Sequence, residues 1–471
     1  MKNASKIILT ASVMTAIMAF YACQSNEETP PPPVPSVKWA WVTGSQTVNQ
    51  TGTYGTKGVA AATNVPGARE DAEGWVDTAD KLWLFGGFGY DSTGYPGRMN
   101  DLWMFDPAAG AWTWVAGSDV RDPDGVYGTL GLADPVSAPG GRNGAASWTD
   151  ASGRLWLFGG LGFDGAGEIG QTNDLWRFDP ATTQWTWLDG SSIRNRPGVY
   201  GTKGVPSSSN IPGARVGAAS AVDPDGAFWL YGGFGYDAAG AKGRLNDLWK
   251  LDPATLEWTW VSGSDTLNQL GVYGELNEPA PENVPGSRYD TCFWIDASGV
   301  IWVCGGDGVD SLGQIFKLND VWKLDPATLE WTWVDGSKIV GVTGVYGELN
   351  IPDQANYPGS RSGAVTWVQA DGAVFLFGGW GIDASSGEGW LDDVWKFDQT
   401  LTTWAWVSGP GVHGYSGKYG TQGTASTSNI PGGRHYPVSW ITSLGVRWLF
   451  GGYGLDSAGA GGHLNDLWRQ E

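Results

Sequence analysis

The residue types that carry most nucleophilic, redox and metal chemistry are scarce in this sequence. Among 471 residues there are only 3 cysteines and 3 histidines. No GxSxG, HExxH or CxxC motif occurs, and no EF-hand loop is complete. The sequence therefore contains no motif of a known catalytic or metal site, no metal ligands are predicted, and a binding function is favoured over an enzymatic one.

Basic residues are also few. Lysine and arginine total 28 against 49 aspartates and glutamates, which gives a formal net charge of -21. This balance disfavours a nucleic-acid partner or an anionic membrane surface. Many acidic residues recur at fixed positions, as Asp91, Asp101 and Asp106 do. We interpret them as a solvated surface that keeps the protein soluble. Ca²⁺ held by some of these loops is the alternative, and no other cofactor is expected.

The N-terminus resembles a bacterial lipoprotein signal. Residues 1–22 contain two early lysines and an apolar run that is too short for a comfortable membrane span. Ala22-Cys23 is similar to a lipobox, which makes Cys23 the expected lipidation site. Residues 23–36 are polar and then proline-rich, typical of a semi-rigid tether. We expect an exported outer-membrane or surface lipoprotein, or otherwise a periplasmic or secreted protein, that touches membrane only through its lipid.

A repeat of 73 residues organises the rest of the chain. Val34 to Glu471 spans 438 residues, which is six times 73. A double glycine begins at the same place in every repeat, at Gly86, Gly159, Gly232, Gly305, Gly378 and Gly451. An arginine precedes each one at constant spacing, at Arg69, Arg142, Arg215, Arg288, Arg361 and Arg434. A period of this length indicates a repeat architecture rather than two or three separate domains.

Each repeat contains four short aromatic-rich runs separated by turn residues, which predicts four strands. In the second repeat they are residues 143–149, 155–158, 174–178 and 185–188. Four-stranded units repeated radially form the blades of a β-propeller. We therefore predict an all-β, six-bladed propeller over residues 37–471. The last repeat lacks its fourth strand, and the N-terminal strand 39–42 is expected to replace it and close the ring.

An arginine, a strand ending in Gly-Gly, the run "NDLW" and a fourth strand bearing tryptophan together resemble the Kelch repeat. The resemblance covers residues 34–471, although Kelch units usually have about fifty residues. It implies a Kelch-type propeller of the galactose oxidase-like superfamily. Kelch propellers include protein-binding adaptors, galactose oxidase and a sialic acid mutarotase, so the resemblance specifies fold more than function.

The candidate binding residues lie where long loops should gather on one face. Of 30 tryptophans, only Trp380 and Trp390 fall outside the repeated positions. His435 and His463 occupy two positions that vary among the repeats, one directly after the arginine and one before "LND". The six arginines could clamp a ligand carboxylate. The alternative for the arginines is a structural pairing with a carbonyl group or with the aspartate of "NDLW".

These features predict a monomeric binding module for a glycan or a protein ligand. The alternative is an envelope enzyme that modifies sugars, of the mutarotase or oxidase kind. An oxidase like galactose oxidase would require copper and a Cys–Tyr cofactor, whereas Cys292 and Cys304 lie in predicted blade strands. Catalysis would also require carboxyl or arginine groups with perturbed pKa values in the central funnel.

Cys292 and Cys304 are equidistant from Ser298, at the centre of the turn "DASG". A hairpin centred there places them directly opposite each other on two strands. In the other repeats the pair is mostly a small residue against an aromatic one, as in a packed cross-strand pair. Export permits a disulfide, but two apolar thiols also pack well without one. The sequence leaves both states open.

Overall fold

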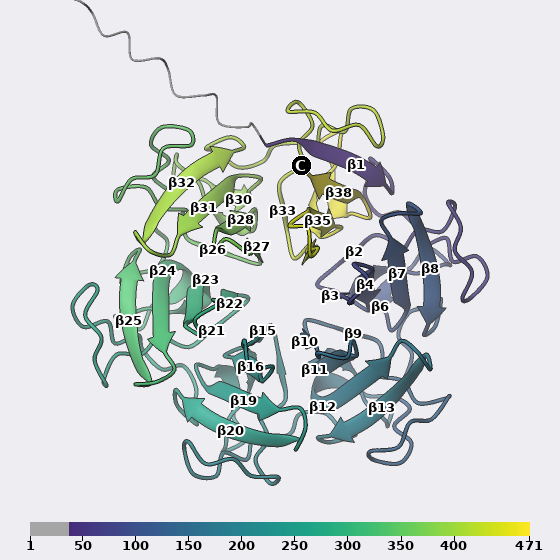
Figure 1. The fold of residues 1–471 in the computed structure, drawn as a ribbon, viewed down its shortest axis with the longest axis horizontal. Helices are drawn as coiled ribbons and strands as arrows, with labels where there is room; N and C mark the ends of the chain where they lie inside the picture. The colour runs from purple at the N-terminus through teal and green to yellow at the C-terminus, as the bar shows by residue number, and fades with distance from the viewer. Residues whose placement is uncertain (1–36) are drawn as a thin grey trace, which may run out of the picture. The chain divides into compact units, whose positions relative to one another are not determined.

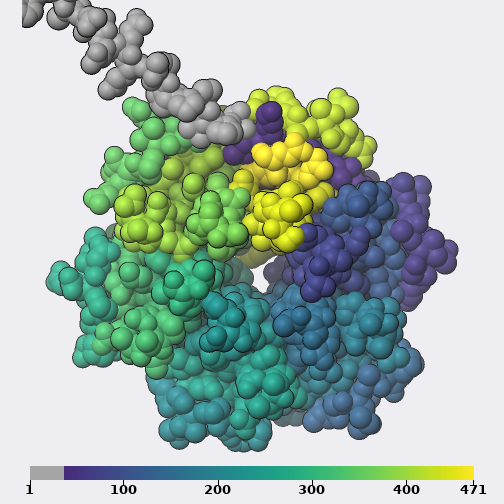
Figure 2. All heavy atoms as spheres, in the orientation of Figure 1, coloured from purple at the N-terminus to yellow at the C-terminus, as the bar shows by residue number. Residues whose placement is uncertain are grey.

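The computed structural model describes residues 37–471 as six antiparallel sheets arranged around a narrow central opening (Figures 1 and 2). The predicted signal peptide, Cys23 and the tether lie outside the described residues. Within residues 37–471 the secondary structure is strand and turn, and no helix there is long and apolar enough to cross a membrane. The predicted all-β, six-bladed propeller is therefore confirmed for this part of the chain.

Each blade has four main strands, which follow one another from the axis outward (Figure 1). Blades 1 to 3 consist of β3 (Glu73–Val76), β4 (Leu82–Phe85), β7 (Leu102–Asp106) and β8 (Ala111–Ala116); β10 (Ala146–Thr149), β11 (Leu155–Phe163), β12 (Ile169–Asp179) and β13 (Gln184–Asp189); and β15 (Ala219–Val222), β16 (Phe228–Tyr231), β19 (Leu248–Asp252) and β20 (Glu257–Ser262). Blades 4 to 6 consist of β22 (Cys292–Ile295), β23 (Ile301–Val309), β24 (Ile315–Asp325) and β25 (Glu330–Asp335); β27 (Val365–Val368), β28 (Val374–Phe377), β31 (Val394–Asp398) and β32 (Thr403–Ser408); and β34 (Val438–Ile441), β35 (Arg447–Phe450), β38 (Leu467–Gln470) and β1 (Trp39–Thr43).

A second, smaller sheet lies at one end of every blade, where the sequence predicted only a loop. The double glycine kinks the chain between the two sheets, with φ of 65° at Gly86 and 92° at Gly87 in blade 1. The strands of the small sheets are β2 (Arg69–Glu70), β5 (Phe88–Tyr90) and β6 (Pro96–Arg98); β9 (Arg142–Asn143) on the extended ends of β11 and β12; β14 (Arg215–Val216), β17 (Phe234–Tyr236) and β18 (Lys242–Arg244); β21 (Arg288–Tyr289) on the extended ends of β23 and β24; β26 (Arg361–Ser362), β29 (Trp380–Ile382) and β30 (Glu388–Trp390); and β33 (Arg434–His435), β36 (Tyr453–Leu455) and β37 (Gly461–His463).

The N-terminal strand occupies the place predicted for it. β1 pairs antiparallel with β38 as the outer strand of blade 6, with Trp39 opposite Gln470 and Trp41 opposite Trp468. Trp39 is buried in the core between blades 5 and 6. Because Gln470 also pairs with Arg447 at the start of β35, the described chain enters at the face opposite the small sheets.

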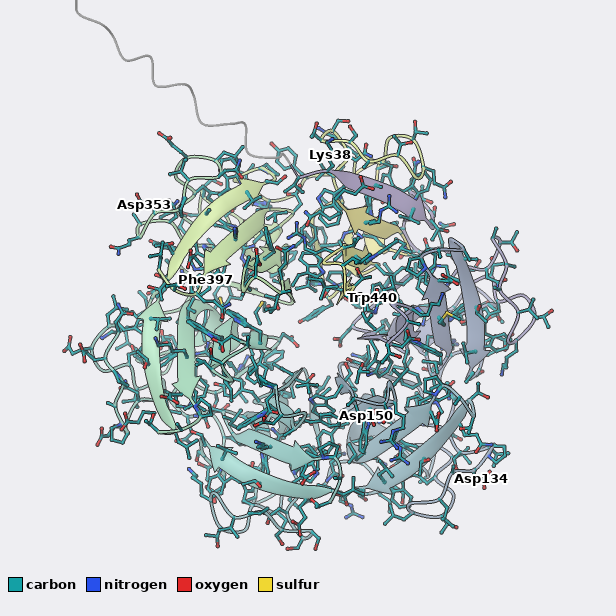
Figure 3. The ribbon with its side chains drawn as sticks, in the orientation of Figure 1. Lys38, Asp134, Asp150, Asp353, Phe397 and Trp440 are labelled. Carbon is teal, nitrogen blue, oxygen red and sulfur yellow. The ribbon has the colours of Figure 1, made fainter. Side chains whose placement is uncertain are left out.

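The long connections between blades cover the outer strands instead of gathering on one face. In blade 5 the backbone N–H of Asp353 donates to the carbonyl of Trp404 in β32, and Asn350 donates to Trp406. Asp353 and Asp134 accordingly lie on the outer circumference, whereas Trp440 lies beside the central opening (Figure 3). Covering an exposed strand edge prevents pairing with other chains. This task accounts for much of the length by which the repeat exceeds an ordinary Kelch unit.

A buried ion pair holds each small sheet to its blade. In blade 1 the guanidinium of Arg69 donates to both carboxylate oxygens of Asp101, at 2.7 and 2.8 Å, and to the carbonyl of Gly86. Asp101 Oδ2 also accepts hydrogen bonds from the Tyr54 hydroxyl and the Trp103 indole. The same pairing recurs in every blade, between Arg142 and Asp174, Arg215 and Asp247, Arg288 and Asp320, Arg361 and Asp393, and Arg434 and Asp466.

Blade 5 differs from the other blades at Asp392, the position at which they have asparagine. In blade 1 that asparagine, Asn100, donates to the carbonyl of Pro139 and accepts from the N–H of Ser118. The residue equivalent to Ser118 is Pro410, which has no N–H. Both carboxyl oxygens of Asp392 are buried without a hydrogen-bond partner. Burial, reinforced by the charge of Asp393, raises the pKa of Asp392 well above its usual range.

The contact between blades 5 and 6 departs from the repeat as well. Arg447 and Gln470 are paired across β35 and β38 at positions that are apolar in the other blades. Arg447 lies 3.8 Å above the ring of Phe375, at a position that is tryptophan elsewhere. Arg447 Nε and Nη1 and both polar side-chain atoms of Gln470 are buried without partners. An unpaired buried polar group costs about 1–3 kcal/mol of stability. The contact between blades 5 and 6 therefore stabilises the fold less than the contacts between the other blades do.

Cys292 and Cys304 lie directly opposite each other, which confirms the predicted register of β22 and β23. Both thiols are buried and free. Of the two states that the sequence leaves open, this structure has the unbridged one. Directly opposed residues in a sheet have Cβ atoms about 4.5–5.5 Å apart, whereas a disulfide requires about 3.8 Å. Burial raises the pKa of Cys292 to about 12 and that of Cys304 well above its usual value.

Asp392→Asn should stabilise the protein in a pH-dependent way. The raised pKa means that native Asp392 keeps a proton which the unfolded chain releases above about pH 4. Native stability is therefore lost as the pH rises through this window. Urea unfolding should show Asp392→Asn to be more stable by about 1–3 kcal/mol at neutral pH, with no gain near pH 3. The exposed Asp225→Asn should show no such difference, and an equal gain at all pH values would contradict the argument.

The buried thiols should resist modification in the native protein and react after unfolding. Because the thiolate is the reactive form, raised pKa values suppress the reaction with a disulfide reagent near pH 8. In a Cys23→Ser variant, unfolding without reductant should release two titratable thiols. A count of zero would mean that Cys292 and Cys304 are bridged.

Candidate functional site

The six small sheets hold the residues that differ most among the repeats. In each small sheet three residues lie directly opposite one another on its three strands, and we call this set a triplet. The triplets are Glu70–Phe88–Arg98, Asn143–Leu161–Gln171, Val216–Phe234–Arg244, Tyr289–Asp307–Lys317, Ser362–Trp380–Trp390 and His435–Tyr453–His463. No two triplets are alike, although the arginines beside them never change.

Strand alternation explains why the triplets can vary. Arg69 and Glu70 are adjacent on β2, so their side chains point to opposite faces of the small sheet. The arginine points into the blade, and Glu70, Phe88 and Arg98 share the other face, where each is half-buried. The same alternation in all blades produces a continuous ring of variable side chains around one end of the axis.

Neighbouring triplets contact each other, so the ring is ordered. Arg98 Nε donates to the carbonyl of Leu161 at 3.1 Å, and Gln171 Nε2 donates to the carbonyl of Phe234 at 2.7 Å. The Arg244 guanidinium forms an ion pair with Asp307 at 2.5 Å. Each link runs from the third residue of one triplet to the middle residue of the next. The side chains of the ring are thereby positioned before any ligand binds.

Blades 5, 6 and 1 carry the aromatic part of the ring. The rings of Trp380 and Trp390 are 5.2 Å apart, edge to face, and Trp390 lies 5.8 Å from Tyr453. Tyr453 lies 4.9 Å from His463, which lies 5.6 Å from Phe88. We call the six residues Trp380, Trp390, His435, Tyr453, His463 and Phe88 the aromatic arc. Most of its members are half-buried, so they keep surface that a ligand can contact.

Glu70 lies between the two histidines of the arc. Its Oε2 is 3.4 Å from His435 Nε2, and its Oε1 is 3.3 Å from His463 Nε2. Burial alone would raise the pKa of Glu70, but hydrogen bonds from His435 and His463 outweigh burial and lower that pKa to about 2. The carboxylate is therefore ionised throughout the physiological range and held in one orientation.

Glu388 is fixed in a similar way at the other end of the arc. Its Oε1 accepts a hydrogen bond from Trp380 Nε1 at 2.6 Å and pairs with Lys317 Nζ at 2.9 Å. Lys317 is largely buried, whereas Glu388 is exposed. A carboxylate held by two partners but open to solvent can still accept hydrogen bonds from a ligand.

Below the triplets, a closed ring of backbone hydrogen bonds surrounds the axis. One residue from each blade donates its N–H to the carbonyl of the preceding blade, at 2.8–3.1 Å, through Asp71, Gly144, Gly217, Asp290, Gly363 and Tyr436. All six have positive φ, which suits the three glycines and is strained for the others, with 57° at Asp71, 52° at Asp290 and 49° at Tyr436. Three blades thus have a polar side chain at a position whose positive φ glycine would adopt without strain.

These three side chains meet in a pocket of about 150 Å³ in the axial channel. The Tyr436 hydroxyl donates to Asp290 Oδ2 at 2.5 Å, and Asn143 Nδ2 donates to Asp71 Oδ2 at 2.7 Å. Burial raises the pKa of Asp71 to about 6 and that of Asp290 well above its usual range. The charge of Glu70 adds to the shift of Asp71, and the charge of Asp71 adds to that of Asp290. Asp71 can therefore take up and release a proton near neutral pH.

The structure divides the predicted site residues into two groups. Trp380, Trp390, His435 and His463 come together in the aromatic arc. The prediction that the six arginines bind a ligand is wrong, because Arg69, Arg142, Arg215, Arg288, Arg361 and Arg434 are at most 3% exposed and bound within their blades. The structural alternative, pairing with the conserved aspartate of the repeat, describes them.

Sequence comparison of the repeats identified two positions of each triplet and missed the middle one. That position follows the double glycine directly and is occupied by Phe88, Leu161, Phe234, Asp307, Trp380 and Tyr453. Its variability was visible in the sequence, but the residue was counted with a loop. Asp71, Asp290 and Tyr436 were missed as well, and their signal is the replacement of glycine in three repeats out of six.

Apart from the ion-paired Asp101 and its equivalents, the repeated aspartates act in turns. Asp91 Oδ1 accepts the N–H groups of Thr93 and Tyr95, and Asp91 Oδ2 accepts that of Arg121. Asp106 likewise accepts the N–H of Ala108. Within residues 37–471 no group of three or more histidine, cysteine or acidic side chains is placed to hold a metal ion.

Comparisons with known proteins agree with this architecture. The family model of the KLHDC2/KLHL20/DRC7 Kelch-repeats domain matches residues 47–267, which correspond to the first three blades. No curated protein matches the chain. Kelch domains generally mediate protein–protein interactions. The match and the six repeats of arginine, double glycine and aspartate support a Kelch-repeat family for this chain, whose fold is a Kelch-type β-propeller.

Proposed function

We propose that this protein is an exported binding module that holds a glycan or protein ligand on the ring of triplets. The observation that carries the proposal is the contrast within each small sheet. The inward arginine is the same in all six blades, whereas the three outward residues differ in every blade. A symmetric frame that presents an asymmetric set of side chains is suited to specific recognition. The interaction role of Kelch domains supports the same proposal.

The position of the N-terminal strand supports a display role. Trp39 enters β1 at the face opposite the triplets. The part of the chain before Val37, on which the lipid is expected at Cys23, therefore joins the propeller at the face that does not carry the triplets. This geometry suits a surface or periplasmic lipoprotein that captures a ligand from its surroundings.

The axial pocket favours a second candidate function, an enzyme that modifies sugars. Asp71 and Asp290 have the raised pKa values that general acid–base catalysis requires, and Tyr436 supplies a hydroxyl between blades 4 and 6. Three strained residues around one pocket are typical of a functional site. The pocket is narrow, however, and it adjoins a much larger ring of half-exposed side chains, so binding is the better-supported function.

Trp380→Ala and Trp390→Ala should each weaken ligand binding with little loss of stability, because neither ring belongs to the core between blades. Trp112→Ala, which empties a fully buried core position, should instead cost about 3–5 kcal/mol. Binding would be measured on arrays of glycans and of proteins with the purified protein, and stability by urea unfolding. Leu444→Ser, on an exposed turn at the opposite face, is the matched control. Binding that survives both tryptophan substitutions but is lost in Leu444→Ser would place the site on the other face.

A further inference from the structure

The ring of triplets offers no free strand edge near the aromatic arc. On the outer side, the N–H of Gly414 donates to the carbonyl of Trp390, and the N–H of Asn49 donates to that of His463. On the inner side, the N–H of Arg434 donates to the carbonyl of Leu391, and its carbonyl accepts from Gly379. An extended peptide binds a sheet by adding a strand to such an edge. With both sides occupied, a ligand can be recognised only through side chains.

The charges of the arc are balanced before a ligand arrives. Glu70 lies between two histidines, and Glu388 is paired with Lys317. Next along the ring, Asp307 is paired with Arg244. Arg98 adds one further positive charge beside Glu70, so the formal charges of Arg98, Arg244 and Lys317 equal those of Glu70, Asp307 and Glu388, although the protein as a whole is strongly acidic. A ligand of high charge of either sign would have to break one of these pairs, so an uncharged polar ligand fits the site better.

The ring also has two chemically different sides. Aromatic faces predominate in blades 5, 6 and 1. Blades 2 to 4 also carry amide, phenol, carboxylate and guanidinium groups, from Asn143, Tyr289, Asp307 and Arg244, beside the apolar Leu161, Val216 and Phe234. A pyranose ring has the matching pair of surfaces, since its C–H face packs on aromatic rings and its hydroxyl groups exchange hydrogen bonds at the edge. Carboxylates such as Glu70 and Glu388 accept hydrogen bonds from hydroxyl groups and cannot donate them.

We propose that the ligand is an uncharged glycan whose sugar rings stack on the aromatic arc and whose hydroxyl groups bond to Glu70, Glu388 and the polar side of the ring. This inference rests on the proposed binding function and narrows its ligand to one class. Stacking at Trp380 and Trp390 supplies most of the affinity. The fixed carboxylates select the orientation of the hydroxyl groups.

The test is an array of neutral hexose and pentose oligosaccharides, uronic-acid and sulfated glycans, and peptides, probed with the full mature chain. Positive ligands are then measured by titration calorimetry at low and high salt. Neutral oligosaccharides should bind with little dependence on salt, because no net charge is neutralised. Trp380→Ala should weaken that binding roughly tenfold or more. Leu444→Ser, on the exposed turn at the opposite face, should leave it nearly unchanged.

Trp380→Phe separates stacking from the hydrogen bond to Glu388, because it keeps an aromatic face and removes Nε1. We expect it to restore much of the affinity that Trp380→Ala loses, and thermal unfolding of all variants checks that they are folded. An array on which no neutral oligosaccharide binds, or binds only through salt-sensitive contacts, overturns the glycan inference. If a peptide or protein binds instead and Trp380→Ala weakens it, the binding function stands without the glycan. A ligand unaffected by both Trp380→Ala and Tyr453→Ala overturns both.

Discussion

The buried ion pair between arginine and aspartate is the interaction on which each blade depends. Both charges lie out of reach of water, so every donor and acceptor around them must be matched. Arg288, for example, donates to Asp320 and to two glycine carbonyls, while Asp320 also accepts from Tyr273 and Trp322. This single cluster joins the small sheet, the blade and the outer connection. It requires the arginine, the double glycine, the "ND" aspartate and the tyrosine to recur together, which is why the repeat is easy to detect in the sequence.

The same ion pair allows the residues in the ring of triplets to vary among the blades. Since the arginine fixes the small sheet from its inner face, the residues on the outer face are not needed to hold the small sheet to its blade and can differ from blade to blade. Their positions remain accurate because the backbone beneath them is held on both edges. Glu70 and Glu388 illustrate the result, because each carboxylate is oriented by partners from a neighbouring blade or strand. A rigid frame with variable outward side chains favours recognition without large rearrangement.

The periodic sequence predicted most of the fold, and the reasons for its failures are specific. Blade number, the place of the N-terminal strand and the opposition of Cys292 and Cys304 all followed from spacing alone, because spacing fixes which residues are equivalent. Spacing does not reveal which way a side chain points. The arginines were therefore kept as candidates for ligand binding beside the structural alternative, although they point inward. The small sheets were taken for loops because β2 and its equivalents have only two residues. Trp380 and Trp390 were found because they broke the pattern, whereas Phe88 and Tyr453 resembled ordinary loop aromatics.

The departures from the repeat concentrate in blades 5 and 6, in the core as well as on the surface. Asp392 leaves buried polar atoms unpaired in blade 5, which carries Trp380 and Trp390, and Arg447 and Gln470 do so in blade 6, which carries His435, Tyr453 and His463. A buried unpaired group lowers stability, and the remaining blades show that apolar residues or asparagine fit these places. The blades that carry most of the aromatic arc are thus the ones that deviate furthest from the most stable version of the repeat. A residue that lowers the stability of the fold next to a binding site is expected where function, rather than packing, determines which residue is present. Of these residues only Asp392 lies at the end of its blade that carries the small sheet, and Arg447 and Gln470 lie at the opposite end.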